Sequence, residues 1–160
     1  MNKRINFNVV QPLAYDAMDA LDQFVNASSL DTLHRELIKI RASQINGCAY
    51  CVDAHSHDAL GLGESLQRVL LVSAWREAGN IFSEHERTLF QMTEEITLIH
   101  RHGLSDETYS KAIELFGEET TSQIIMVIVT INAWNRIGVA THLQPSRRKK
   151  MPERATDHSQ

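Results

Sequence analysis

Residues 30–57 read LDTLHRELIKIRASQINGCAYCVDAHSH and combine a helical pattern with two closely spaced cysteines. Apolar side chains recur at helical spacing through the first half, at Leu30, Leu33, Leu37, Ile40 and Ile45. Asn46-Gly47 supplies a stop, and a second helix is expected to begin around Cys48 and run to Leu60. A thioredoxin fold would need a strand before the cysteines. The helical segment there predicts a helical scaffold instead.

The rest of the chain continues this pattern. Further helices are expected over residues 64–78, from about 83 to 101, from about 105 to 117, and over 118–143. Ser83 and Glu86 form a capping box at the start of one of them, and Ser105 caps the next. No alternating strand pattern occurs. The predicted fold class is all-α.

The last segment, 118–143, is apolar on nearly all sides between Ile124 and Ile131. Such a helix must be central in the fold or shared between subunits. Asn132, Asn135 and Arg136 interrupt it, and they are expected to satisfy one another or a neighbouring subunit. We therefore expect a central last helix and some burial between subunits.

Composition places the chain among soluble globular proteins. It has 160 residues, of which 42% are hydrophobic and 22% charged. We expect one domain over 1–145 and a polar, disordered tail over 146–160, which holds the basic run from Arg147 to Lys150. The net charge of -4 argues against nucleic-acid binding. No signal peptide or bilayer-spanning run is visible, so the predicted location is the cytoplasm, without membrane association.

The chemistry of the chain is concentrated at Cys48 and Cys51. Two cysteines separated by two residues at a helix start lie on one turn, close enough to form a disulfide. The helix dipole and unpaired backbone N–H groups there favour a thiolate. His55 follows Cys51 by four residues, so an imidazole lies on the same helical face and can take a thiol proton. In a reducing compartment this pattern indicates redox catalysis or metal binding.

Three alternatives compete with the redox interpretation. A c-type haem site needs histidine directly after the second cysteine, where Val52 stands, so that site is excluded. Zinc could use Cys48, Cys51, His55 and His57, although structural zinc sites usually draw two pairs from separated segments. The cysteines could also be small buried hydrophobes. The residues alone do not decide which thiol attacks, because the helix terminus favours Cys48.

Glu36, Cys48, Cys51 and His55, in the spacing Glu-x11-Cys-x2-Cys-x3-His, resemble the signature of the AhpD-like alkylhydroperoxidases of the carboxymuconolactone decarboxylase superfamily. The segments 44–51, 74–77, 82–87 and 131–136 are similar to that family as well. The resemblance covers roughly residues 12 to 145. One departure is Tyr50, which stands where the best-known peroxidases of the family have histidine; tyrosine donates a hydrogen bond but does not titrate near neutral pH.

The resemblance implies an all-helical bundle that assembles as a homo-oligomer, often a trimer or hexamer. We expect no cofactor and no bound metal. It implies that Cys51 is the peroxidatic cysteine, that Cys48 is the resolving cysteine and proton donor, and that His55 and Glu36 form a proton relay. From the helix pattern alone, Glu36 would be expected in solvent. The implied substrate is hydrogen peroxide or a small organic hydroperoxide, and the implied reductant is a dithiol, such as a lipoyl group or a thioredoxin-like protein. The alternatives are a protein disulfide oxidoreductase and a non-enzymatic zinc-binding or redox-sensing module.

Overall fold

The computed structural model describes residues 4–147, so most of the predicted tail lies outside the described residues. Every regular element in this range is helical. The elements are α1 (Phe7–Val10), α2 (Pro12–Ala27), α3 (Thr32–Asn46), α4 (Ala49–Gly61), α5 (Leu66–Leu71), the 3-10 helix η1 (Val72–Glu77), α6 (Glu84–Thr97) and α7 (Asp106–Thr141). The all-α prediction is confirmed.

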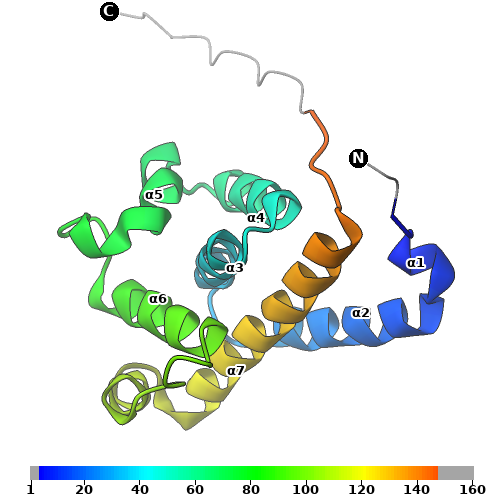
Figure 1. The fold of residues 1–160 in the computed structure, drawn as a ribbon. Coiled ribbons are helices and arrows are strands. Elements are labelled where there is room, and N and C mark those ends of the chain that lie inside the picture. The colour runs from blue at the N-terminus through cyan, green and yellow to red at the C-terminus, as the bar shows by residue number, and fades with distance from the viewer. Residues whose placement is uncertain (1–3, 148–160) are drawn as a thin grey trace, which may run out of the picture.

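Helix α3 is the centre of the bundle and packs against α4, α6 and α7. Figure 1 shows α3 nearly end-on, with α4 and α6 on opposite sides of it. Its two faces supply two hydrophobic cores. Ile38 belongs to the core shared with α2, α6 and α7, whereas Leu37 and Ile40 belong to the core beneath α4, α5 and η1. The predicted apolar face of this segment is therefore buried, and a second face is buried as well.

Several helix ends lie where the sequence predicts them. Gly47 has a left-handed backbone (φ 68°) and ends α3. Ser83 forms a complete capping box at the start of α6, and Ser105 accepts a hydrogen bond at the start of α7. Gly117 (φ 73°) interrupts α7, which matches the boundary predicted there. Helix α6, by contrast, ends at Thr97, one turn earlier than predicted.

The prediction of a single helix over 64–78 is wrong. Helix α5 has six residues, η1 follows it, and Ala74 leaves the helical conformation with φ -123°. Trp75 explains the break, because its Nε1 donates a 2.7 Å hydrogen bond to Glu94 on α6. Contacts with a helix far along the chain therefore override a continuous local pattern.

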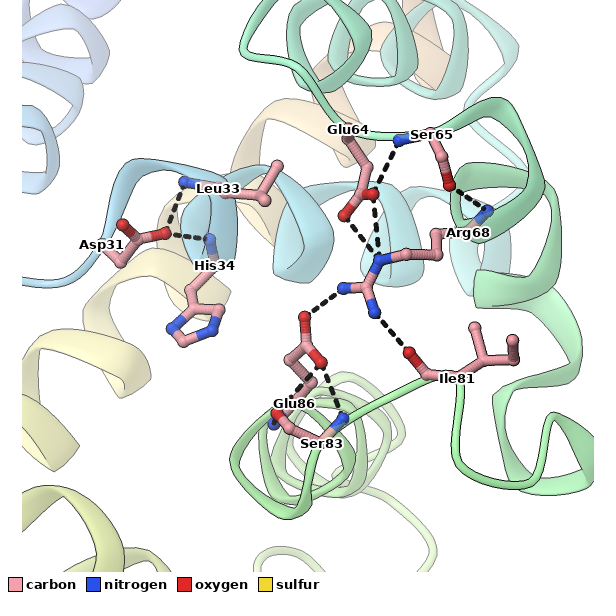
Figure 2. A network of polar contacts seen from close by, with 9 residues as sticks. All are labelled: Asp31, Leu33, His34, Glu64, Ser65, Arg68, Ile81, Ser83 and Glu86. Carbon is pink, nitrogen blue, oxygen red and sulfur yellow. Dashed lines mark hydrogen bonds and ion pairs between the residues drawn. The ribbon is translucent and has the colours of Figure 1, made fainter.

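Arg68 links α5 to the start of α6 through hydrogen bonds and ion pairs. Its guanidinium forms an ion pair with Glu64 at 2.9 Å, bonds to Glu86 of the capping box and donates to the carbonyl of Ile81 (Figure 2). Glu86 thus caps α6 and binds Arg68 with the same carboxylate. This network closes the side of the bundle opposite α2 and α7.

Helix α7 is the only described element long and apolar enough, by length and composition, to cross a bilayer. It packs against α2, α3 and α6, and Ile124, Ile128 and Ile131 are buried. The central helix of a soluble bundle meets the same criterion of length and apolar composition. The predicted central position of this segment is confirmed.

Candidate active site

The turn between α3 and α4 carries the cysteine pair. The left-handed backbone of Gly47 turns the chain, so that Cys48 becomes the N-cap of α4. Cys48 Sγ accepts a 3.4 Å hydrogen bond from the backbone N–H of Cys51. The two sulfurs are joined in a disulfide, and their Cα atoms are 5.3 Å apart, within the usual range for such a bond. The pair is therefore placed to cycle between dithiol and disulfide without a large backbone movement.

The buried carboxylate of Glu36 lies beside the cysteine pair and bonds to His55 and Lys39. Nδ1 of His55 is 2.7 Å from Oε2 of Glu36, and Lys39 Nζ donates to Oε1 at 2.8 Å. Burial raises the pKa of the Glu36 carboxyl, but His55 and Lys39 outweigh this effect and bring that pKa below its ordinary value. Because the ionised carboxylate holds Nδ1, the other ring nitrogen of His55 is left to exchange a proton with a reacting group.

A cavity of about 850 Å³ opens against this site. Tyr50, Cys51 and His55 of α4 form part of its wall, and Cys48 does not. The apolar walls come from α2 and α7 and include Val25, Val127, Ile131, Trp134 and Ile137. Both cysteines are almost fully buried, so the cavity gives a bound molecule access to Cys51 in preference to Cys48.

Helix α7 passes directly over the disulfide at Gly138. A Cβ atom at this position would lie 3.2 Å from Cys48 Sγ and 3.8 Å from Cys51 Sγ. The first distance is shorter than the 3.5–4.0 Å of a favourable nonbonded contact between carbon atoms. Glycine therefore permits the close approach by which α7 covers Cys48.

Hydrogen bonds between side-chain amides connect the end of α3 to α7 close to the cysteines. Asn46 Nδ2 donates to the side-chain oxygens of Asn132 and Asn135, at 3.0 and 2.9 Å. Asn135, which is fully buried, donates onward to Ser43 at 3.0 Å, and Arg136 donates to Asn132 at 2.9 Å. Arg136 and Asn132 bond to each other as predicted, whereas Asn135 is satisfied by Asn46 and Ser43 of α3. The network fixes the residue directly before the Gly47-Cys48 turn.

Comparison with known proteins identifies the family. The model of the carboxymuconolactone decarboxylase family matches residues 12–95, just over half of the chain. The chain belongs to the carboxymuconolactone decarboxylase family. The resemblance to its AhpD-like branch, drawn from the Glu36 and cysteine spacing, is confirmed.

Three members or neighbours of this family are informative. The uncharacterized protein YdfG of Bacillus subtilis (strain 168) is 37% identical over 140 residues, which cover 88% of this chain and 95% of YdfG. A crystal structure is known for a protein of unknown function from Agrobacterium tumefaciens, provisionally named the antioxidant defence protein AhpD. That protein is 37% identical to this chain, with a TM-score of 0.88, and the match covers 92% of this chain and all of the other. The debrominase Bmp8, solved with 2,3,4-tribromopyrrole, shares the fold at 20% identity and a TM-score of 0.76, covering 85% of this chain and 72% of its own.

The structure brings together the four residues singled out from the sequence of this family member: Glu36, Cys48, Cys51 and His55. Glu36 is buried, contrary to what the helix pattern alone suggests. Sequence reasoning missed Lys39, although its spacing of three from Glu36 is that of a helical ion pair. It also missed Gly138, whose position inside a helical pattern is the available signal. Asp22, which lines the cavity from α2, had no signal of either kind.

The zinc alternative drew on both cysteines, His55 and His57. Both sulfurs are bonded to each other, and His57 is exposed, with its Nδ1 3.9 Å from Asp58. Among the described residues, the side chains of Glu36, His55 and Asp58 lie close enough together to ligate one metal ion. Lys39 already occupies one oxygen of Glu36, and its positive charge opposes a second cation there. The zinc alternative stays a prediction.

Proposed function

We propose that this protein is a dithiol-dependent peroxidase that reduces hydrogen peroxide or small organic hydroperoxides in the cytoplasm. The supporting observation is that Cys51, bonded to Cys48, lines a cavity whose wall also holds His55, and that Glu36 bonds to His55 from behind that wall. An accessible sulfur, a second sulfur within bonding distance and a proton acceptor are the groups that a dithiol peroxidase needs. Membership in a family with an AhpD-like antioxidant branch supports the same activity.

In this mechanism Cys51 is the peroxidatic cysteine. His55 takes its thiol proton, and Glu36 stabilises the resulting imidazolium. The thiolate attacks the distal oxygen of the hydroperoxide, the O–O bond breaks, and its electron pair leaves with the alkoxide. Cys48 donates its thiol proton to the alkoxide, which gives the alcohol, or water when the substrate is hydrogen peroxide, and Cys51 becomes a sulfenic acid.

Cys48 then acts as the resolving cysteine. Its thiolate attacks Cys51 Sγ, the S–O bond breaks, and hydroxide leaves and is protonated to water. An external dithiol, such as a lipoyl group or a thioredoxin-like protein, reduces the disulfide and is itself oxidised to a disulfide. The sum is one hydroperoxide and one dithiol converted to one alcohol, one water and one disulfide.

The test mixes reduced protein with cumene hydroperoxide and counts thiols. We expect the loss of two thiols per chain, no loss in Cys51→Ser, and a trappable sulfenic acid in Cys48→Ser. No peroxide-dependent thiol loss in the wild type, or equal loss in Cys51→Ser, would refute the proposal. A much faster reaction with a protein disulfide than with the peroxide would favour the disulfide oxidoreductase instead.

We also propose that the chain forms a homo-oligomer, a trimer or hexamer. Large apolar side chains remain exposed along α2 and α7, among them Leu13, Phe24 and Val139. An interface between copies of this chain would remove these side chains from water, which is favourable. Sedimentation of the purified protein at micromolar concentration should show the oligomer, and a monomer alone would contradict the proposal.

A further inference from the structure

Lys39 has no part in the mechanism above, although it lies at the site. Its ammonium group donates to Oε1 of Glu36 at 2.8 Å, while His55 holds Oε2 of the same carboxylate at 2.7 Å. Lys39 and His55 both line the cavity together with Cys51, whereas Glu36 does not. One carboxylate therefore separates a fixed positive charge from the imidazole that takes the thiol proton.

The burial of Lys39 is unusual for an ion pair within one helix. Its side chain is 12% exposed, and that of Glu36 is 9% exposed. A lysine on a helix ordinarily keeps its charge in water, where an ion pair contributes little to stability. A buried charge acts on its neighbours more strongly than an exposed one, because less water screens the field between them. The charge of Lys39 therefore acts on the groups that share its side of the cavity.

Two carboxylates lie close to Lys39. Glu36 is in direct contact, and Asp22 on α2 is near enough that Lys39 and His55 both act to lower the pKa of its carboxyl, although burial raises that pKa overall. Without Lys39, His55 and Cys51 would face these two negative charges with no buried cation among them.

The remaining charged and titratable groups around the cavity are more exposed or are neutral near pH 7. Arg4, the other fixed cation on the wall, is exposed and donates to the carbonyl of Ala140. The carboxylate of Asp58 lies within 4.8 Å of His55 but is also exposed, so water screens both charges. The other titratable side chains on the wall are Tyr15, Tyr50 and His142.

Two carboxylates without a cation would oppose the activation of Cys51 in two ways. They attract a proton from solvent to His55, and a ring that is already protonated cannot take the thiol proton. They also repel the thiolate that forms on Cys51. A positive charge on Lys39 counters both effects. The direction is the same whether His55 or Cys51 loses its proton first, because a nearby cation favours every proton release.

We infer that Lys39 is a positioning residue for the proposed peroxidase reaction: by sharing Glu36 with His55, it allows Cys51 to form its thiolate at a lower pH. The inference rests on the proposed function, which gives that thiolate its use. The shared carboxylate keeps Nζ of Lys39 within about 8 Å of Nδ1 of His55, and at an effective dielectric constant of about 20 such charges shift a proton equilibrium by about one to two pH units. Solvent that enters the cavity reduces this effect, so we expect about one pH unit.

The test titrates the Cys51 thiol directly. In a Cys48→Ser background Cys51 is the one thiol of the chain, and the ultraviolet absorbance of its thiolate is followed against pH. We expect Lys39→Gln to raise the midpoint by about one pH unit, because glutamine keeps a hydrogen-bond donor for Glu36 but carries no charge. Lys39→Met should raise it as well, and Lys39→Arg should leave it near the background value. With both cysteines present, the pH dependence of oxidation by cumene hydroperoxide should be displaced in the same direction.

Arg41→Met, in the same background, is the matched control. Arg41 lies two residues after Lys39 and therefore on another face of α3, and its ion pair with Glu94 is buried to a similar degree, at 17% and 13% exposure. Its loss should lower the free energy of unfolding and leave the midpoint unchanged. A midpoint that stays at the background value in Lys39→Gln or in Lys39→Met, or that rises equally in Arg41→Met, would overturn the inference.

The titration involves no peroxide, so the two proposals can fail separately. A raised midpoint in a protein that oxidises no thiol with any hydroperoxide would refute the proposed function and leave the effect of Lys39 on Cys51 standing. Rapid thiol oxidation by peroxide with an unchanged midpoint would refute the role of Lys39 alone.

Discussion

Replacement of Glu36 by glutamine tests the relay beside the cysteines. Glutamine keeps the size of the side chain but offers Nδ1 of His55 a neutral oxygen in place of a carboxylate. A hydrogen bond to a charged group contributes about 1.5–3 kcal/mol and a neutral one about 0.5–1.5 kcal/mol, so the change costs about 1–2 kcal/mol. If that difference falls on the protonated imidazole formed during Cys51 activation, the oxidation rate drops about 5- to 30-fold.

Glu86→Gln is the matched control. Both glutamates are 7% exposed and both have a pKa below the ordinary value, yet Glu86 pairs with Arg68 on the other side of the bundle (Figure 2). We expect both variants to lose about 1–2 kcal/mol of unfolding free energy at neutral pH. A carboxylate with a lowered pKa stabilises the fold above its unfolded pKa, near 4.5. That contribution is lost as the pH falls through the folded pKa, so each variant and the wild type should converge in acid.

The assay is stopped-flow oxidation of the reduced protein by cumene hydroperoxide at neutral pH, with urea unfolding of the same samples. Only Glu36→Gln should slow the oxidation, whereas both variants should unfold at lower urea concentration. Oxidation of Glu36→Gln at the wild-type rate would refute the relay. An equal slowing in Glu86→Gln would show that lost stability, rather than the contact with His55, is responsible.

Three further outcomes are expected. Gly138→Ala places a methyl group 3.2 Å from Cys48 Sγ. The crowding costs about 1–3 kcal/mol, whereas alanine gains about 1 kcal/mol in helix propensity. The Tm of the oxidised protein, measured by calorimetry, should therefore fall. Asn135→Ala leaves buried polar partners unsatisfied and should cost about 1–3 kcal/mol in urea unfolding. The pKa values of Glu86 and Glu94 lie below the ordinary value, so the unfolding free energy should decline between about pH 6 and about pH 3; a pH-independent value would contradict this.

Local signals were sufficient for much of the fold. A glycine with a left-handed backbone is needed at Gly47 and Gly117, and a serine cap is needed at Ser83 and Ser105; each is visible in a few neighbouring residues. The break at Ala74 was missed because nothing adjacent to it disfavours a helix. It follows from bonds between η1 and α6, which connect residues about twenty positions apart.

The same division applies to the site. Cys51 and His55 are four residues apart on one helix, so their common face could be predicted. Glu36 approaches His55 from another helix, and only its spacing in a known family pointed to it. Asp22 is bonded to Trp134 across 112 positions of sequence, and an isolated aspartate in an amphipathic helix carries no sign of such a contact. Cavity residues contributed by separate helices need the packed structure.

The difference between the two sulfurs is the clearest case of packing deciding chemistry. The dipole of α4 acts on both, and as the N-cap Cys48 is the better placed to be an anion. Yet α7 covers Cys48 at Gly138, while Cys51 lies one turn later and opens onto the cavity. In the proposed mechanism a substrate in the cavity therefore reaches Cys51 first, and Cys48, the sulfur favoured by the helix terminus, attacks Cys51 afterwards. This arrangement suits the resolving role, because a stabilised thiolate within bonding distance stands ready for the sulfenic acid.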